Sequence, residues 1–209
     1  MKIKRLQDAY RNGVFMMKLL HRLRKMGLTL EFYYVHVGRP SDLQDVNESW
    51  EPKLAEYEAG FLHEEDMSEV ASCEEWLSEE LLLDRMRRGL KCFAVKHRGQ
   101  IVSYLWCAFE EIACACYQTK LKENEVHLFN AYTRPDYRGK GLAPFMRYQC
   151  YNALSNMGIE KFYSVCDVFN APSVRYKEKT NTPLHKLGLF FALGDKYSRN
   201  WILKEYETA

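Results

Sequence analysis

The sequence predicts a mixed α/β domain in which helices flank a twisted mixed sheet, with an amphipathic helix added at the N-terminus. Strand-like runs alternate along the chain with runs of helical spacing. Hydrophobic residues make up 47% and charged residues 28% of the 209 residues, as in an ordinary globular protein. No repeat or linker divides the chain. We therefore expect an N-terminal extension of helix and strand, 1–54, and a main domain, 55–209.

The first 27 residues contain eight Lys or Arg and one Asp. Apolar residues at spacings of three and four predict a helix over 5–26 that Gly27 ends, with a basic outer face. That face is either solvated or contacts an anionic membrane surface or an acidic carrier protein. The aromatic and β-branched run 28–38 then predicts a strand.

The next segment is acidic, with fifteen Asp or Glu against four Lys or Arg over 41–90. It predicts a short strand and two helices that end at Gly89. The acidic helices, 64–88, either present a solvated face or line a pocket for a cationic amine. Two hairpin-linked strands over 91–97 and 101–117 follow, and then a strand over 126–133.

The last third of the chain alternates in the same way. Helical spacing over 142–157 ends at Gly158, and 161–170 predicts a strand. The run after Asn170 begins as a helix, and Thr182-Pro183 predicts the start of a second short helix. Two more strands are expected over 189–206.

Composition argues against several classes of protein. The seven cysteines are an odd set, mostly within apolar runs, which indicates a reducing compartment and argues against a structural metal site. No apolar run approaches the roughly 20 residues of a membrane span. The N-terminus lacks a cleavage site, so we expect a cytoplasmic protein. No basic stripe with interleaved aromatic residues supports nucleic-acid binding.

The segment YRGKGLA, residues 137–143, joins the strand over 126–133 to the following helix. Helix N-terminal amides attract anions, and Gly139 and Gly141 allow the backbone to approach a phosphate closely. Arg138 and Lys140 add positive charge. The pattern is neither a Walker loop nor a dinucleotide fingerprint, because Lys140 precedes a glycine and Pro144 stands where a third glycine is required.

The run PDYRGKGLA, the helix that ends at Gly158, the strand that ends at Asn170 and the run NAPSVRYKEK together resemble the GNAT-type N-acetyltransferase superfamily. The resemblance covers roughly residues 55–207. It implies a sheet whose central strands splay apart to admit acetyl-CoA or another acyl-CoA. The pyrophosphate would lie on the glycine turn, and the pantetheine arm beside the preceding strand. The implied cofactor-binding residues are Ala131, Thr133, Arg138, Gly139, Lys140, Gly141, Leu142, Ala143, Asn170 and Ser173.

The sequence departs from the family pattern at two places. In the stricter register of the glycine motif, Asp136 occupies a position where the family has Gln or Arg. The family's general-acid tyrosine would fall at Lys177, one residue after Tyr176, and the following glycine, Gly188, arrives seven residues late. Tyr176 is therefore either the general acid or a packing residue.

Two side chains at the start of the strand over 126–133, Glu125 just before it and His127 within it, are candidates for a general base. Glu125 and His127 share one face of the strand, and the family frame places His127 where a base acts directly or through water. The alternative for each is a buried structural role. The expected oxyanion donor is a backbone amide near Ala131, where the strand must bulge.

These observations favour an enzyme that transfers an acyl group, preferably acetyl, from CoA to a primary amine by direct attack. One alternative is a long-chain N-acyltransferase that uses acyl-CoA or acyl carrier protein. A second alternative is a CoA-binding sensor or partner module with little turnover. The sequence leaves open the acceptor and whether the chain forms a homodimer.

Overall fold

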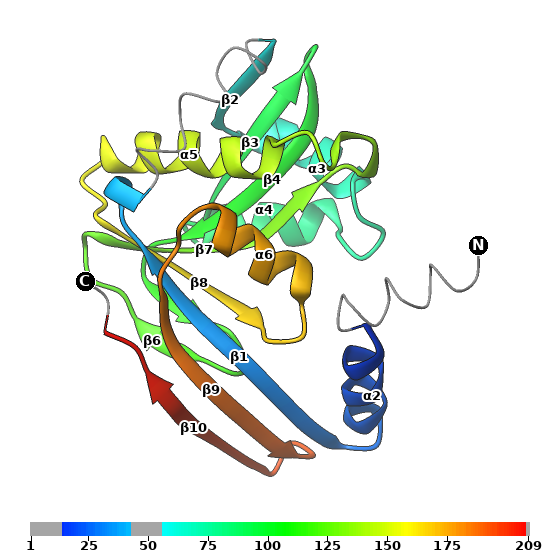
Figure 1. Cartoon of the computed structure of the whole chain (residues 1–209). Coiled ribbons are helices and arrows are strands. Elements are labelled where there is room, and N and C mark those ends of the chain that lie inside the picture. The colour runs from blue at the N-terminus through cyan, green and yellow to red at the C-terminus, as the bar shows by residue number, and fades with distance from the viewer. Residues whose placement is uncertain (1–13, 43–55, 208–209) are drawn as a thin grey trace. The chain divides into compact units, whose positions relative to one another are not determined.

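The computed structural model describes residues 14–42 and 56–207 (Figure 1). Contacts divide the chain into two compact units. The first unit consists of residues 1–38, 113–119 and 164–209, and the second of 39–112 and 120–163. The boundary expected between residues 54 and 55 lies outside the described residues.

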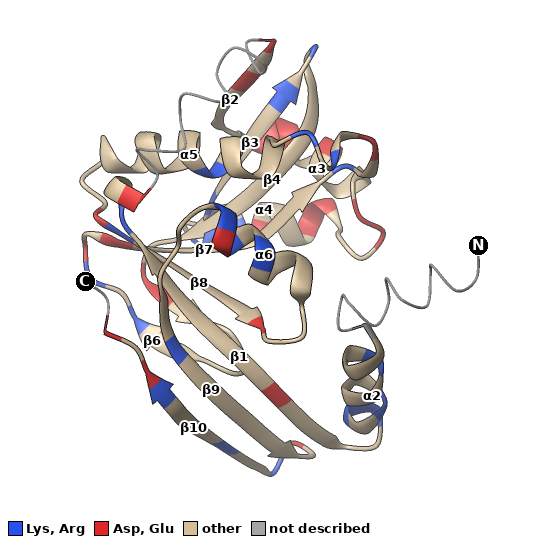
Figure 2. Cartoon of the chain, viewed as in Figure 1, with Lys and Arg blue, Asp and Glu red and all other residues tan. Residues whose placement is uncertain are grey.

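The second unit contains a sheet with the strand order β8-β7-β4-β3-β2. Only the β7–β8 pair is parallel, and the other neighbours are antiparallel. The strands are β2 (Tyr57–Phe61), β3 (Lys91–His97), β4 (Gln100–Ala108), β7 (Glu125–Thr133) and the beginning of β8 (Lys161–Asp167). The helices are the 3-10 turns η3 (Glu64–Asp66) and η4 (Pro135–Tyr137) with α3 (Met67–Ser72), α4 (Glu79–Arg87) and α5 (Leu142–Ser155). The two acidic helices and the strand before them are confirmed, and Figure 2 shows the acidic residues on α3 and α4.

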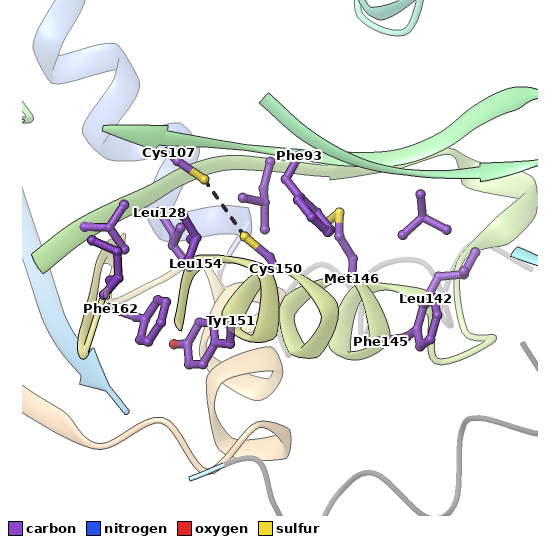
Figure 3. Packing of buried hydrophobic residues seen from close by; sticks show 14 of the residues in the cluster. Phe93, Cys107, Leu128, Leu142, Phe145, Met146, Cys150, Tyr151, Leu154 and Phe162 are labelled. Atoms are coloured by element: carbon purple, nitrogen blue, oxygen red, sulfur yellow. Dashed lines mark hydrogen bonds between the residues drawn. The ribbon is translucent and has the colours of Figure 1, made fainter. Parts of the chain in front are cut away.

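Two apolar clusters hold this sheet between its helices. The cluster on α5 includes Val126 and Leu128 of β7, and Met146 and Cys150 point from α5 toward the sheet (Figure 3). The sulfur atoms of Cys107 and Cys150 lie 3.9 Å apart as free thiols. The other cluster joins α3 and α4 to the opposite residues of β3 and β4. Alternation along each strand therefore covers both faces of the sheet.

The first unit contains strands in the order β10-β9-β1-β8, with the end of β8 at one edge. Its elements are α2 (Val14–Lys25), β1 (Leu28–Gly38), α6 (Ala171–Lys179), β9 (Leu184–Leu193) and β10 (Tyr197–Glu205). The predicted strand over 28–38 is confirmed. The predicted helix is confirmed over α2, whereas residues 5–13 lie outside the described part. Two short strands, β5 (Glu111–Ala113) and β6 (Gln118–Lys120), pair separately.

Two sequence predictions of secondary structure were wrong. Thr182-Pro183 does not begin a helix, because β9 starts at Leu184 and pairs with β1. The carbonyl of Pro183 already accepts from the amide of Val37, 3.1 Å away, so the segment is drawn into the sheet. The strand expected over 101–117, most of which lies in the second unit, ends at Ala108, and β5 follows separately. Cys114 and Tyr117 then exchange backbone hydrogen bonds across a turn.

Gly188 has a local role in this sheet. The ring of Tyr33 on β1 lies across Gly188 on β9, and its hydroxyl donates to Oδ1 of Asn200 on β10 at 2.7 Å. A Cβ at Gly188 would lie 2.1 Å from Cζ of Tyr33. Only glycine leaves room for this cross-strand contact.

The helix α2 presents a basic outer face with exposed apolar side chains among the cations. Phe15 is 69% and Leu19 43% exposed, and the last turn carries Arg22, Arg24 and Lys25. Contact with an anionic surface or carrier protein stays a prediction. No helix in the described ranges is long and apolar enough to cross a bilayer.

Candidate functional site

A β-bulge interrupts β7 close to its C-terminal end. Tyr132 pairs with Tyr104 and Phe129 with Trp106, so Asn130 and Ala131 together face a single residue of β4. Asn130 adopts a left-handed conformation with φ of 47°. The bulge expected near Ala131 is therefore confirmed, and it re-aims the backbone amides of β7 at this point.

The pairing between β7 and β8 covers only the beginning of β7. It extends from Glu125 opposite Lys161 to His127 opposite Tyr163. The next six residues of β7, 128–133, take no part in this ladder. The β7–β8 pairing within the second unit thus ends just before the bulge, and the expected splaying of the central strands stays a prediction.

The turn between β7 and α5 is built from a 3-10 turn and two glycines in left-handed conformation. Gly139 has φ of 78°, and Gly141, with φ of 82°, is the N-cap of α5 without a side-chain hydrogen bond. Within the described part of the chain, the amides of residues 139–142 donate no hydrogen bond. The helix dipole adds partial positive charge at the same place. These amides are available to an anionic ligand.

Cationic and polar side chains surround this turn. Nζ of Lys140 lies 4.8 Å from the ring centroid of Tyr137. Nε of Arg138 donates to the carbonyl of Thr133 at 2.9 Å, which closes the turn against the end of β7. Oγ1 of Thr133 points inward and lies 2.8 Å from Oγ of Ser103, whereas Ala131 is exposed. The backbone near Ala131 is therefore the more accessible part of the strand.

Glu125 and His127 have different environments although both are buried. The carboxylate of Glu125 accepts from the amide of Lys122 at 3.1 Å and from the Tyr163 hydroxyl at 3.4 Å. It also lies 3.6 Å from Nζ of Lys161. These contacts fasten the start of β7, so Glu125 has a structural explanation.

The imidazole of His127 lies two residues closer to the bulge. It stacks on Phe129, with ring centroids 5.3 Å apart and an interplanar angle of 15°. Its side chain is on the face of β7 opposite Val126 and Leu128, which pack on α5. Of the two predicted candidates for the base, His127 is the one beside the bulge.

Arg85 is a residue of this region that the sequence analysis did not single out. Its guanidinium carbon lies 5.2 Å from the Trp106 ring centroid and 5.6 Å from that of Phe129. The signal in the sequence is its spacing, since Arg85 follows the buried Leu82 by three residues and so occupies the core-facing side of α4.

The remaining predicted site residues belong to α6 in the first unit. The Asn170 side chain caps this helix and accepts from the amide of Ser173 at 3.3 Å. Lys177, which stands at the family's tyrosine position, is buried and its ammonium group donates to the Ser164 hydroxyl. Tyr176 is partly exposed.

A model of the acetyltransferase (GNAT) family matches residues 49–181, more than half of the chain. The chain belongs to this family. The predicted superfamily and fold are thereby confirmed, and membership of an acetyltransferase family agrees with the prediction of an enzyme. No curated protein sequence matched the chain.

Solved structures share the fold at low sequence identity. A GNAT-family acetyltransferase from Novosphingobium aromaticivorans has a TM-score of 0.54 at 17% identity, covering 82% of this chain and 69% of that one. A protein of unknown function from Staphylococcus epidermidis has a TM-score of 0.54 at 8% identity, with coverages of 81% and 64%.

A glucosamine N-acetyltransferase region of a fungal multi-domain β-N-acetylglucosaminidase has a TM-score of 0.57 at 12% identity. It covers 83% of this chain, which spans 23% of the fungal protein. The present chain also spans less than two thirds of the Staphylococcus epidermidis protein. These likenesses concern the fold alone.

Proposed function

We propose that this protein transfers an acetyl group from acetyl-CoA to the primary amine of a small acceptor by direct attack. The observation that carries the proposal is that the amides of residues 139–142 donate no hydrogen bond in the described part of the chain. They follow the bulged strand β7, whose pairing with β8 ends at His127. The diphosphate of the cofactor needs amides that are free to donate, and its thioester needs a backbone amide at the bulge to stabilise the oxyanion.

The residues of the turn fit the cofactor's pyrophosphate. The amide of Arg138 already donates to the carbonyl of Pro135 at 3.3 Å, so the amides of residues 139–142 would bind its oxygens, and Lys140 would add a cation at the rim. The pantetheine arm would run beside the backbone of Ala131 and Thr133 as an added strand. Asn170 and Ser173 stay predicted cofactor residues, although their mutual hydrogen bond already explains their presence at the start of α6.

The chemistry follows from the bulge and its neighbours. As the amine attacks the thioester carbon, negative charge develops on the carbonyl oxygen, and a backbone amide near Ala131 stabilises it. The nitrogen loses a proton, which His127 accepts through water. The carbon–sulfur bond then breaks, and the CoA thiolate takes up a proton. Tyr176 remains the proposed donor of that proton.

Two alternatives make different predictions for the same protein. A long-chain N-acyltransferase would prefer a fatty acyl donor carried on CoA or acyl carrier protein. A CoA sensor would bind the cofactor without turnover, and the replacement of the family's tyrosine by Lys177 is the observation that favours it.

The experiment combines binding and turnover. Calorimetry with acetyl-CoA measures affinity, and release of free thiol is followed with acetyl-CoA or long-chain acyl-CoA and a panel of primary amines. We expect micromolar acetyl-CoA binding and amine-dependent thiol release. Binding without any amine-dependent release would support the sensor, and absence of binding would contradict the proposed cofactor site.

A further inference from the structure

Arg85 is a cation of α4 that forms no ion pair with the residues that the structure describes. Nη1 of its guanidinium is buried and makes no hydrogen bond among these residues. Its neighbours Arg87 and Arg88 differ, because both lie within 4.0 Å of the Asp84 carboxylate. Burial lowers the pKa of Arg85, because the guanidinium is partly withdrawn from water.

The surroundings of Arg85 do not compensate its charge. The acid that contributes to its electrostatic environment is Glu74, whose carboxylate already accepts a hydrogen bond from the Tyr104 hydroxyl. The faces of Trp106 and Phe129 attract a cation but offer no hydrogen-bond acceptor. The indole N–H of Trp106 is also buried and has no hydrogen-bond partner in the part of the chain that the structure describes. Two adjacent side chains thus have unused donors.

Unsatisfied buried donors are rare in folded proteins and cost stability. A guanidinium group that is partly withdrawn from water is stabilised most by a carboxylate, which matches its planar donors in a bidentate pair. An anionic oxygen beside Arg85 would therefore accept the hydrogen bond that its guanidinium does not make within the described part of the protein.

Arg85 lies close to the part of β7 where acyl transfer is proposed to occur. The guanidinium carbon is 5.6 Å from the ring of Phe129, and Phe129 directly precedes the bulged residues Asn130 and Ala131. The other neighbour of Phe129 on this face is His127. Arg85 is thus separated by a single aromatic side chain from the strand segment where the amine would attack.

We propose that Arg85 binds a carboxylate of the acceptor, so that the acceptor is an amino acid or a similar small compound with its amine and carboxylate a few bonds apart. The inference rests on the proposed function, since it takes the acyl group to lie at the bulge. The carboxylate replaces the missing partner of Arg85 and holds the amine near Phe129. Arg85 then determines specificity.

The test uses acceptor pairs that differ only in this charge, such as glycine with glycinamide and alanine with alaninamide. Amine-dependent thiol release gives kcat/KM for each, and the preference is the ratio of acid to amide. Comparison of ratios between variants cancels the different basicity of the two amines. Arg85→Gln removes the charge, and Arg88→Gln is the matched control, because Arg88 is an exposed arginine of the same helical segment.

We expect Arg85→Gln to lower the preference at least about thirtyfold, through the KM of the acid, with the KM of acetyl-CoA unchanged. Arg88→Gln should behave as wild type, and Arg85→Lys should retain part of the preference. An unaltered preference in Arg85→Gln would overturn the proposal. If Arg85→Gln does not fold, Arg85→Lys provides the comparison, and full retention of preference would then count against bidentate binding.

A second measurement separates this inference from the proposed function. The same acids and amides are titrated in thermal unfolding experiments without acetyl-CoA. Acids, but not amides, should raise the Tm of wild type and of Arg88→Gln, and neither should raise the Tm of Arg85→Gln. If wild type binds acetyl-CoA but the acids do not raise its Tm, the proposed carboxylate site is contradicted and the proposed function is not. Failure of acetyl-CoA binding would contradict the proposed function instead.

Discussion

Two strand–turn–helix junctions in this chain have the same outline and opposite chemistry. At the first, β7 leads through the glycine turn into α5, whose N-cap is Gly141 without a side chain to accept from the helix amides. At the second, β8 leads into α6, whose N-cap Asn170 accepts from the amide of Ser173. Asp167 adds a hydrogen bond from the amide of Phe169 at 2.6 Å.

The difference shows how sequence decides whether a helix N-terminus is a binding site. Every helix begins with amides that have no intrahelical acceptor. Asn and Asp supply an acceptor from within the chain, so the second junction is closed by its own side chains. Glycine supplies none and leaves the first junction dependent on a ligand or solvent. The amides of the first junction can be stabilised by a bound ligand, whereas those of the second are stabilised by side chains of the protein.

The largest expected effect comes from placing a carboxylate in the open junction. Gly139→Glu should lower acetyl-CoA affinity by about a hundredfold or more, because it puts a negative charge and a side chain where the diphosphate would bind. Calorimetry with acetyl-CoA measures this loss.

Gly99→Glu is the matched control. Gly99 has φ of 77° against 78° for Gly139, and a Cβ at either position meets no atom within 4 Å. Both substitutions should therefore cost similar stability, and only the first should affect the cofactor. Equal acetyl-CoA affinity in the two variants would contradict the anion site.

The second prediction concerns the strand that leads into the open junction. His127→Ala should reduce kcat by about a hundredfold, the usual size of a general-base contribution, with little change in acetyl-CoA affinity. It should also remove the acidic limb of the pH–rate profile, because the protein then lacks the group whose deprotonation permits catalysis.

Glu125→Gln serves as the comparison for His127→Ala, since it alters a buried carboxylate on the same strand. The Glu125 carboxylate is held by Lys122 and Tyr163, so its loss should lower the Tm and leave the pH profile in place. If His127→Ala retained the wild-type profile, the role of His127 as base would be excluded.

The glycine turn and the alternation of strands and helices could be predicted because they are local properties. Left-handed glycines and helical spacing appear in the sequence at the residues where they act, as at Gly139 and Gly141. The bulge at Asn130 followed from the resemblance to the family. Thr182-Pro183 misled for a related reason, because a local capping pattern there is overruled by pairing between β9 and β1.

Arg85 and the second junction show what sequence could not supply. An arginine at a core-facing position of α4 looks like one more surface cation in the sequence, and only the structure shows that its Nη1 is buried without a hydrogen bond among the described residues. Asn170 was predicted to contact the cofactor, and only its bond to Ser173 reveals that it also caps α6. Such assignments depend on contacts between side chains, which spacing does not encode.

The third prediction tests whether Asn170 both closes α6 and contacts the cofactor. Asn170→Ala should destabilise the protein by about 1 kcal/mol, the usual cost of losing an N-cap, and should also lower acetyl-CoA affinity because Asn170 is a proposed cofactor residue. Asn170→Asp should restore most of the stability because a carboxylate also accepts from the amide. Chemical unfolding and calorimetry are compared for both variants. Unchanged acetyl-CoA affinity in Asn170→Ala would contradict the proposed contact between Asn170 and the cofactor.

The smallest effect is expected at Asp167, on the lead-in to the closed junction. Burial raises the pKa of its carboxyl above the ordinary value of 3.8, although the hydrogen bond from Phe169 opposes the shift. The folded state therefore holds this proton more tightly than the unfolded state, so the stabilisation is present at low pH and is lost as the pH rises through the raised pKa. Asp167→Asn keeps the acceptor for the Phe169 amide and removes the charge. It should raise the Tm by about 1 to 2 °C at pH 7 and by nothing at pH 3. Thermal unfolding across this range checks the sign, and a lower Tm at pH 7 would mean that the ionised carboxylate itself helps to close the junction.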